Sequence, residues 1–164
     1  MSINRGKQFE DRLREQFEKL PDTLCLRLYD VTMGYSNINN PCDFIIYRKG
    51  TINLFELKAI HGSILNFKAH IRENQWNELL KYSKIGGVNA GIICWFIDFD
   101  KTIFIPIQSL QVLKEENFKS FNCRVANSNL YKDLGVESFE INADKKRVFF
   151  EYDLEMLLEE ISYE

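Results

Sequence analysis

The stretch that decides the fold is Asp43–Lys58, DFIIYRKGTINLFELK. It predicts two short strands joined by a tight turn at Lys49-Gly50-Thr51. Successive side chains of a strand alternate between its two faces, so Glu56 and Lys58 project from the same face. Charged groups on a buried strand cost free energy unless they are paired or functional. The apolar residues around the pair favour a central strand over an edge strand: Ile52, Leu54, Phe55, Leu57 and Ile60.

Two carboxylates and one ammonium group in this pattern suit the hydrolysis of a phosphodiester. Asp43 and Glu56 supply oxygen ligands of the kind that Mg²⁺ prefers. Such a cation lowers the pKa of a bound water and neutralises charge on a phosphate. Lys58 then orients that water or stabilises the charge that develops on the phosphate. The alternative is that Glu56 and Lys58 form a solvated pair worth under about 1 kcal/mol, and the Glu-x-Lys spacing alone does not separate the two.

Length and composition indicate a globular protein. We expect 164 residues to form a single domain, with a core at about 4–115 and a small αβ extension at about 136–164. Hydrophobic residues make up 45% of the chain, which argues against disorder. No apolar run approaches the about 20 residues needed to cross a bilayer, and residues 1–5 do not resemble a secretory signal. The cysteines are too widely spaced for a zinc site or a disulfide framework, and they predict reduced thiols in a cytoplasmic protein: Cys25, Cys42, Cys94 and Cys123.

The net charge of −3 is unevenly distributed. Residues 151–164 hold six acidic and no basic residues, so the rest of the chain has 21 basic against 18 acidic residues, or +3. This excess leaves room for a mildly positive face, although composition alone does not indicate a nucleic-acid partner.

The N-terminal third predicts a helix and a strand. Gly6–Leu20 shows a buried stripe at helical spacing, and Glu10 lies beside that stripe, either reaching a site at its border or pairing with Arg14 in solvent. Thr23–Tyr29 alternates like a half-buried strand. The polar segment Asp30–Cys42 predicts a loop that leads to Asp43 and whose tip is placed to contact a substrate.

The segment after Lys58 predicts a loop over 59–66 and a helix over Lys68–Lys84. Gln75 is a polar residue in the apolar stripe of that helix. It is either a hydrogen-bonded core glutamine or a residue that faces the site. Ala90–Phe96 is almost continuously apolar and predicts a strand buried on both faces.

The remaining elements complete an α/β pattern. We predict a strand at 102–107, a short helix at 109–116 capped by Ser109, strands at 139–141 and 147–152, and a last helix capped by Asp153. This order predicts an α/β fold with a central mixed β-sheet flanked by helices.

Several short motifs follow one another along the chain: Asn4-Arg5-Gly6 with Phe9-Glu10, Asp43, Phe55-Glu56-Leu57-Lys58, Gln75, and Gly86-Gly87 before an apolar strand. In this order they resemble the RecU-type Holliday junction resolvases of the PD-(D/E)XK nuclease superfamily. The similarity runs from about Asn4 to about Leu113, with a weaker echo at 152–154. It implies a restriction-endonuclease-like core.

The resemblance also implies roles for these residues. Asp43 and Glu56 would ligate Mg²⁺, or Mn²⁺ as a substitute, with help from the Leu57 backbone carbonyl. Lys58 would act on the attacking water.

Glu10 would bind or orient the metal shell, and Gln75 would line the site. The family works as a homodimer on four-way junctions, which suits a two-fold substrate.

The chain also departs from the cellular members of this family. Only 13 residues, 30–42, separate Tyr29 from Asp43, where cellular RecU proteins carry a longer segment that forms a stalk. The polar, Thr-rich lead into the aspartate is replaced here by Asn40-Pro41-Cys42. The compact form resembles a phage-type relative, which would act in the host cytoplasm.

The sequence therefore predicts a metal-dependent, structure-selective DNA endonuclease, a Holliday junction resolvase of DNA recombination and repair. Two alternatives stay open. One is a PD-(D/E)XK endonuclease of the restriction or repair type. The other is a non-catalytic protein that binds branched DNA and docks a recombinase or helicase through its acidic C-terminus. The candidate DNA-binding residues are basic side chains of the predicted helices: Arg5, Lys7, Arg14, Lys68 and Arg72.

Overall fold

Strand β3 (Thr51–Ile60), which carries Glu56 and Lys58, runs through the middle of a mixed sheet. The computed structural model describes residues 4–29 and 40–162, and within these the strand order is β1-β2-β3-β5-β6-β8. β3 pairs with β2 on one side and with β5 on the other, which confirms a central strand. The other strands of this sheet are β1 (Thr23–Arg27), β2 (Phe44–Arg48), β5 (Val88–Phe96), β6 (Lys101–Pro106) and β8 (Phe139–Glu140).

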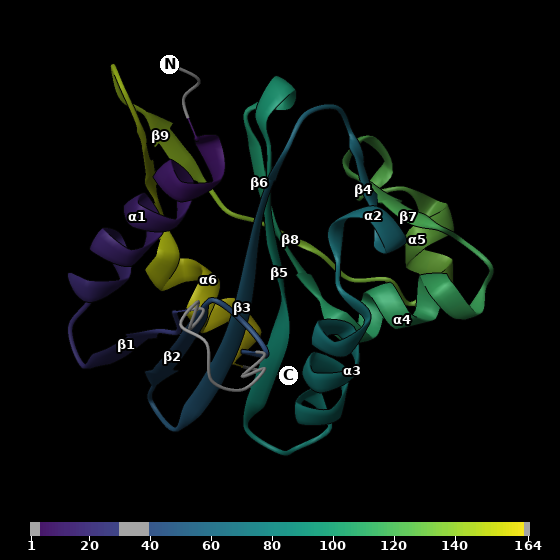
Figure 1. Ribbon diagram of the computed structural model, residues 1–164, viewed down its shortest axis with the longest axis horizontal. Coiled ribbons are helices and arrows are strands. Elements are labelled where there is room, and N and C mark those ends of the chain that lie inside the picture. The colour runs from purple at the N-terminus through teal and green to yellow at the C-terminus, as the bar shows by residue number, and fades with distance from the viewer. Residues whose placement is uncertain (1–3, 30–39, 163–164) are drawn as a thin grey trace, which may run out of the picture.

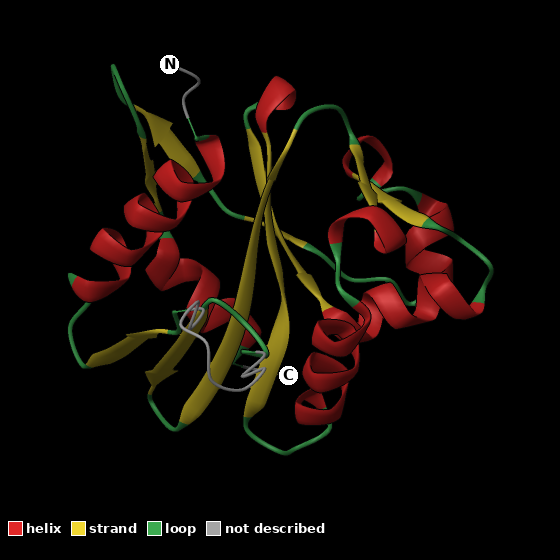
Figure 2. Cartoon of the chain, in the orientation of Figure 1, coloured by secondary structure: helices red, strands yellow, loops and turns green. Residues whose placement is uncertain are grey.

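Helices cover both faces of this sheet (Figure 1, Figure 2). One face packs against α1 (Arg5–Glu18) and α6 (Leu154–Ile161), and the other against α3 (Glu73–Ser83) and α4 (Ile107–Glu115). The predicted fold class is therefore confirmed. The remaining described elements are short: β4 (Ile64–Asn66), α2 (Phe67–His70), η1 (Ile97–Phe99), β7 (Ser120–Asn122), η2 (Cys123–Val125), α5 (Asn129–Leu134), β9 (Ala143–Lys145) and β10 (Phe150–Tyr152).

The sheet separates two apolar cores. Alternation along β3 sends Leu54 and Ile60 to the core beneath α3, and Phe55 and Leu57 to the core beneath α1. Phe55 is fully buried, and its ring centroid lies 5.9 Å from that of Phe17 on α1. The apolar stripe predicted for the N-terminal helix is therefore the face that packs on β3.

A two-residue turn sets the register of the β2–β3 hairpin. Lys49 and Gly50 have φ values of 49° and 83°, the positive values that a type I′ turn needs at both central positions. Arg48 pairs with Thr51 directly across the turn, and Phe44 pairs with Phe55 at the open end. The turn predicted from the sequence is thus confirmed.

The connection from β3 to the parallel strand β5 differs from the prediction. The predicted loop at 59–66 is shorter, because β3 continues to Ile60 and β4 begins at Ile64. The single helix predicted over Lys68–Lys84 is two helices, since Ile71 is extended with φ −122° and ψ 120°. Its side chain is 5% exposed and belongs to the apolar core beneath α3. The break lets α3 return along the sheet and lie beside β5.

β1 occupies the predicted position and is covered on one side, as a half-buried strand should be. Leu24 and Leu26 are 50% and 46% exposed, whereas Cys25 and Arg27 lie on the more buried side. That side faces α1, whose acidic residues Glu10 and Asp11 both bind Arg27. The following loop, predicted at Asp30–Cys42, falls mostly on 30–39, outside the described residues.

Ser109 is not the helix cap that the sequence predicted. α4 begins at Ile107 with Pro106 in the capping position. Ser109 lies inside the helix, is buried, and accepts a hydrogen bond from the Glu137 backbone N–H at 2.9 Å. It therefore ties the chain before β8 to α4.

The C-terminal segment packs on the sheet face that α1 also covers. Asp153 caps α6 by accepting a hydrogen bond from the Met156 backbone N–H at 3.1 Å, as predicted. Glu155 of this helix pairs with the buried Arg48 of β2. Two acids of α6 are therefore engaged within the chain, the second being Glu159, whose carboxylate lies 3.7 Å from Lys49 Nζ. None of the helices in residues 4–29 and 40–162 is long and apolar enough to span a bilayer.

Gly91 of β5 gives a test of this packing. A methyl group there would lie 2.3 Å from the Ile105 carbonyl oxygen, a backbone atom of the paired strand β6. We expect Gly91→Ala to lower the free energy of unfolding by about 3 kcal/mol in urea denaturation. Gly86→Ala is the matched control, because its Cβ would meet no atom within 4 Å. Equal stability of the two variants would contradict this close β5–β6 approach.

Candidate active site

Asp43 closes a gap where the β2–β3 pairing ends. β2 begins opposite Phe55, so the second half of β3 has no β2 partner. The backbone N–H of Asp43 donates to the Phe55 carbonyl at 3.0 Å. The backbone N–H of Leu57 donates to Asp43 Oδ2 at 2.8 Å. The Asp43 side chain thus accepts a hydrogen bond from a backbone N–H on the part of β3 that β2 does not cover, beside Glu56.

Glu56 and Lys58 project together from β3, as predicted, and are in direct contact. Glu56 Oε1 lies 2.8 Å from Lys58 Nζ. Glu56 is 4% exposed, whereas the Lys58 side chain is 23% exposed. Glu56 Oε2 is buried and has no hydrogen-bond partner among the described residues. A buried carboxylate oxygen without a partner is rare, and it indicates an acceptor that is ready for a cation or a donor.

Gln75 is the second buried group with an unsatisfied oxygen. It lies in the first turn of α3 and is 2% exposed. Its Oε1 has no hydrogen-bond partner in the part of the chain that the structure describes. Of the two interpretations that the sequence left open, a satisfied core glutamine does not describe this oxygen.

The five side chains predicted as catalytic line one cavity of about 350 Å³. They come from four elements or connections: Glu10 from α1, Asp43 from the segment before β2, Glu56 and Lys58 from β3, and Gln75 from α3. Leu57, whose carbonyl was predicted as a metal ligand, lines the same cavity. The structure thus brings together residues up to 65 positions apart, from Glu10 to Gln75. Their roles stay predictions.

Glu10 lies at the border of this cavity and forms an ion pair with Arg27 of β1. Arg27 also binds Asp11 at 3.2 Å, so one guanidinium group holds two carboxylates of α1. Burial raises the pKa of Glu10, and the charge of Arg27 opposes that shift. The sequence analysis missed Arg27. Its only signal was a cation between Leu26 and Leu28 in a half-buried strand.

Asp43 is the most strongly perturbed acid of the site. Burial, followed by the nearby charge of Glu56, raises the pKa of Asp43 to about 7, although the Leu57 N–H favours the ionised form. The cavity therefore holds carboxylates in an environment that disfavours their negative charge. Perturbed acids of this kind cluster at functional sites.

The donor set of the cavity suits a hard divalent cation. Within residues 4–29 and 40–162, no three His, Cys, Asp or Glu side chains are grouped closely enough to form a metal site by themselves. The Asp43 and Glu56 carboxylates lie beside the unpartnered Gln75 oxygen. Mg²⁺ is commonly bound by one or two carboxylates, with water and substrate phosphate completing its shell. These residues therefore suit Mg²⁺ as a partial set of ligands, with water and substrate phosphate completing its shell.

The predicted DNA-binding residues do not gather at one place. Arg72 lines the candidate active site and also borders the adjoining cavity, which Lys68 lines. Arg14 lies 3.9 Å from Asp11. Arg5 lines a separate cavity near the start of α1, and Lys7 is exposed on that helix.

Comparison with known proteins finds distant likeness among solved structures. No protein-family model matches the chain, and no curated protein matches it. Among solved structures, the chain is similar to Hjc, a Holliday junction resolvase from the archaeal hyperthermophile Archaeoglobus fulgidus. The identity is 20%, the match covers 63% of this chain and 78% of that chain, and the TM-score is 0.47. At these values the likeness does not by itself establish a family or an activity.

The raised pKa of Asp43 predicts how stability depends on pH. Its pKa of about 7 in the folded protein lies above the ordinary value of 3.8, so the folded protein binds this proton more tightly. The resulting stabilisation is present at pH 4 and is lost as the pH rises to 7. In EDTA at pH 8 we expect Asp43→Asn to be more stable than the wild type by on the order of 2 kcal/mol in urea denaturation.

The control is Asp133→Asn, which removes an exposed carboxylate on α5. It should change the free energy of unfolding little at pH 4 and at pH 8. An Asp43→Asn protein that is less stable than the wild type at pH 8 would show that the carboxylate stabilises the fold instead of straining it.

Proposed function

We propose that this protein is a metal-dependent DNA endonuclease that resolves four-way junctions. The observation that carries the proposal is a pair of buried oxygens, Glu56 Oε2 and Gln75 Oε1, which have no hydrogen-bond partner among the described residues and lie in one cavity with Asp43. The order of the motifs, which resembles the RecU-type resolvases, supports the choice of substrate. The proposed ligands of the cation are Asp43, Glu56 and the Leu57 carbonyl, with Glu10 and Gln75 at the border.

A cation bound there would supply an activated water and neutralise charge on the phosphate. The chain's own groups would do the remaining work. Lys58, held by Glu56, is proposed to orient the attacking water or to stabilise the charge that develops on the phosphate. Arg72, exposed at the rim of the cavity, is proposed to hold a phosphate of the substrate.

We further propose that the protein acts as a homodimer in the cytoplasm. A four-way junction has two-fold symmetry, and two copies of one site related by a two-fold axis would cut its opposing strands symmetrically. Mg²⁺ as the natural ion, a phage-type origin, and docking of a recombinase or helicase on the acidic C-terminus stay predictions.

Cation binding predicts a metal-dependent stability. Because a divalent cation would relieve the repulsion between Asp43 and Glu56, we expect millimolar Mg²⁺ or Mn²⁺ to raise the Tm of the wild type. The rise should be lost in Asp43→Asn and Glu56→Gln, and kept in Asp133→Asn. Differential scanning fluorimetry measures the Tm with the added cation and in metal-free buffer that contains EDTA. Equal Tm shifts in all four proteins would place the cation elsewhere.

Cleavage tests the activity directly. A labelled four-way junction and a linear duplex of the same sequence are incubated with Mg²⁺ or with EDTA. We expect paired symmetric nicks in the junction alone, and a loss of at least about 100-fold in rate for Lys58→Ala, because such groups contribute that much to catalysis. Junction binding should stay within a few-fold of the wild type. Lys49→Ala, at the exposed hairpin turn, is the matched control.

The other outcomes separate the alternatives. Equal cutting of the linear duplex would keep the nuclease and remove the junction specificity. Tight junction binding without cutting under any metal would favour the non-catalytic accessory protein. Loss of fold in Lys58→Ala, together with loss of binding, would indicate that Glu56 and Lys58 are a structural pair.

A further inference from the structure

A second cavity, of about 300 Å³, lies between the start of α1 and the β9–β10 hairpin. Figure 1 places the hairpin beside the N-terminal half of α1. Among the residues that line the cavity, Asp100 is the one acid. Five are cationic: Arg5, Arg12, Lys145, Lys146 and Arg147. We call it the hairpin cleft. It is distinct from the candidate active site, because the residues that line the two cavities do not overlap.

The cations of the hairpin cleft are only partly neutralised. Lys145 lies 2.8 Å from Asp100, and Lys146 lies 3.5 Å from Glu151. Arg12 lies 3.5 Å from Glu15, a contact on the exposed surface of α1 that contributes little. Arg5 and Arg147 have no ion-pair partner in residues 4–29 and 40–162. The cleft therefore keeps a surplus of positive charge that favours an anion.

Trp95 adds a buried hydrogen-bond donor to the lining of the cleft. Trp95 of β5 is 8% exposed and lines the cleft. Its Nε1–H is buried and has no acceptor among the described residues. A buried indole N–H usually finds an acceptor. A phosphate oxygen in the cleft would supply it.

The cleft is held in shape before any ligand arrives. Gln16 of α1 makes two hydrogen bonds to one backbone edge of β10: its Nε2 donates to the Phe150 carbonyl at 2.9 Å, and its Oε1 accepts from the Tyr152 N–H at 2.7 Å. The Arg12 guanidinium lies 4.5 Å from the centroid of the Phe149 ring. These contacts fix the hairpin on α1, so ligand binding would not have to order it.

The hairpin cleft and the candidate active site lie on opposite flanks of α1. The buried stripe of that helix contains Phe9 and Leu13. Helical spacing puts Arg5 and Arg12 on one side of this stripe and Glu10 on the other. An anionic polymer that reaches the active site past α1 would therefore meet the cleft.

We propose that the hairpin cleft binds the sugar–phosphate backbone of a DNA arm whose scissile phosphate lies in the candidate active site. The proposal rests on the proposed function for the identity of the polymer. Arg5 and Arg147 contact phosphates, Trp95 Nε1–H donates to a phosphate oxygen, and the cleft reads no base sequence.

The test measures binding without cleavage. Fluorescence anisotropy with a labelled four-way junction is recorded in EDTA over a series of salt concentrations. We expect Arg5→Ala/Arg147→Ala to weaken binding at least tenfold at low salt. The slope of log K against log salt should fall by about 1.4 to 1.8, since each of the two lost phosphate contacts removes about 0.7 to 0.9. Arg5→Lys/Arg147→Lys should restore most of the slope.

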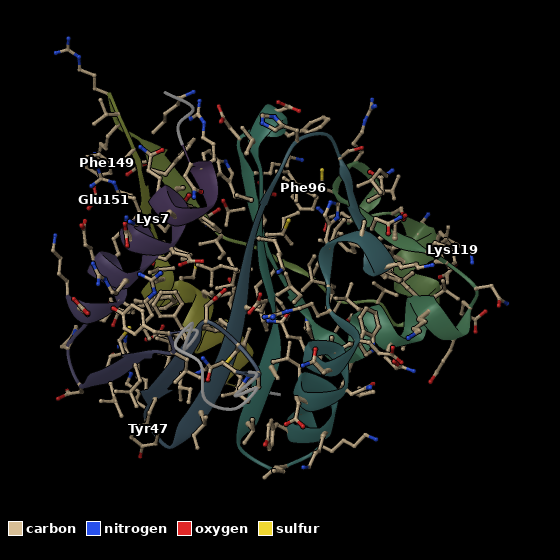
Figure 3. The ribbon with its side chains drawn as sticks, viewed as in Figure 1. Lys7, Tyr47, Phe96, Lys119, Phe149 and Glu151 are labelled. Carbon is tan, nitrogen blue, oxygen red and sulfur yellow. The ribbon has the colours of Figure 1, made fainter. Side chains whose placement is uncertain are left out.

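The matched control removes two lysines from the opposite side of the molecule. Lys119→Ala/Lys132→Ala changes the net charge equally, and Figure 3 shows Lys119 far from Phe149 and Glu151 of the hairpin. It should leave the slope nearly unchanged. Trp95→Phe removes the N–H and keeps an aromatic ring, so it should weaken binding at all salt concentrations without changing the slope.

Binding and cleavage outcomes are separable. If the wild type binds and cuts junctions but the double variant binds equally well, the cleft proposal is overturned and the nuclease stands. If the wild type binds but never cuts, the nuclease proposal fails and the variants still decide the cleft. If the wild type binds no DNA in EDTA, or if the control loses as much affinity as the cleft variant, the cleft is not a DNA site.

Discussion

The two hydrogen bonds that fix Asp43 to β3 are the constraint on which the rest of the site depends. The Asp43 N–H binds the Phe55 carbonyl, and the Leu57 N–H binds the Asp43 carboxylate. They continue the β2–β3 register that the Lys49-Gly50 turn sets, and they place one carboxylate beside Glu56 in the same step. A slip of one residue along β3 would exchange its two faces, sending Glu56 into the aromatic core and Phe55 into the cavity. The alternation that builds the core therefore also builds the site.

The packing on the other side of β3 keeps this arrangement in place. Phe55 lies between Phe17 and Phe104, and this apolar burial holds the strand where Glu56 is desolvated. Phe55 and Glu56 are neighbours in the chain that face opposite ways. The favourable burial of one offsets the cost of burying the other. This packing does not relieve the repulsion between the Asp43 and Glu56 carboxylates.

Local patterns explain what the sequence could and could not predict. The Lys49-Gly50 turn, the stripe of α1 and the Asp153 cap are set by residues close in the chain, and all three were predicted correctly. The side on which β1 is covered depends on the Arg27–Glu10 pair, which joins two elements. Alternation alone predicts two faces and not which of them meets a helix. The hairpin partner β9 was missed because Ala143–Lys145 is exposed throughout and shows no apolar alternation.

The sequence predicted those parts of the site that the order of its motifs specifies. Asp43, Glu56 and Lys58 come from one hairpin, whose geometry is nearly fixed by its turn. Gln75 is placed by α3, a separate helix that begins after the extended Ile71, and nothing in its own spacing decides between core and cavity. The unpartnered oxygens are a property of three-dimensional packing that no spacing contains.

In the proposed complex with DNA, helix α1 would act as a spacer of fixed width. Its buried stripe anchors it to β3, with a polar site on each flank, and an α-helix with its side chains is about 10–12 Å across. A strand gripped on one flank would thus present a phosphate to the carboxylates on the other flank, at a set distance along the duplex axis. The duplex rises 3.4 Å per nucleotide of each strand, so this width corresponds to about three nucleotides. The position of a cut relative to the gripped phosphates would then be measured by a helix diameter and not read from the bases.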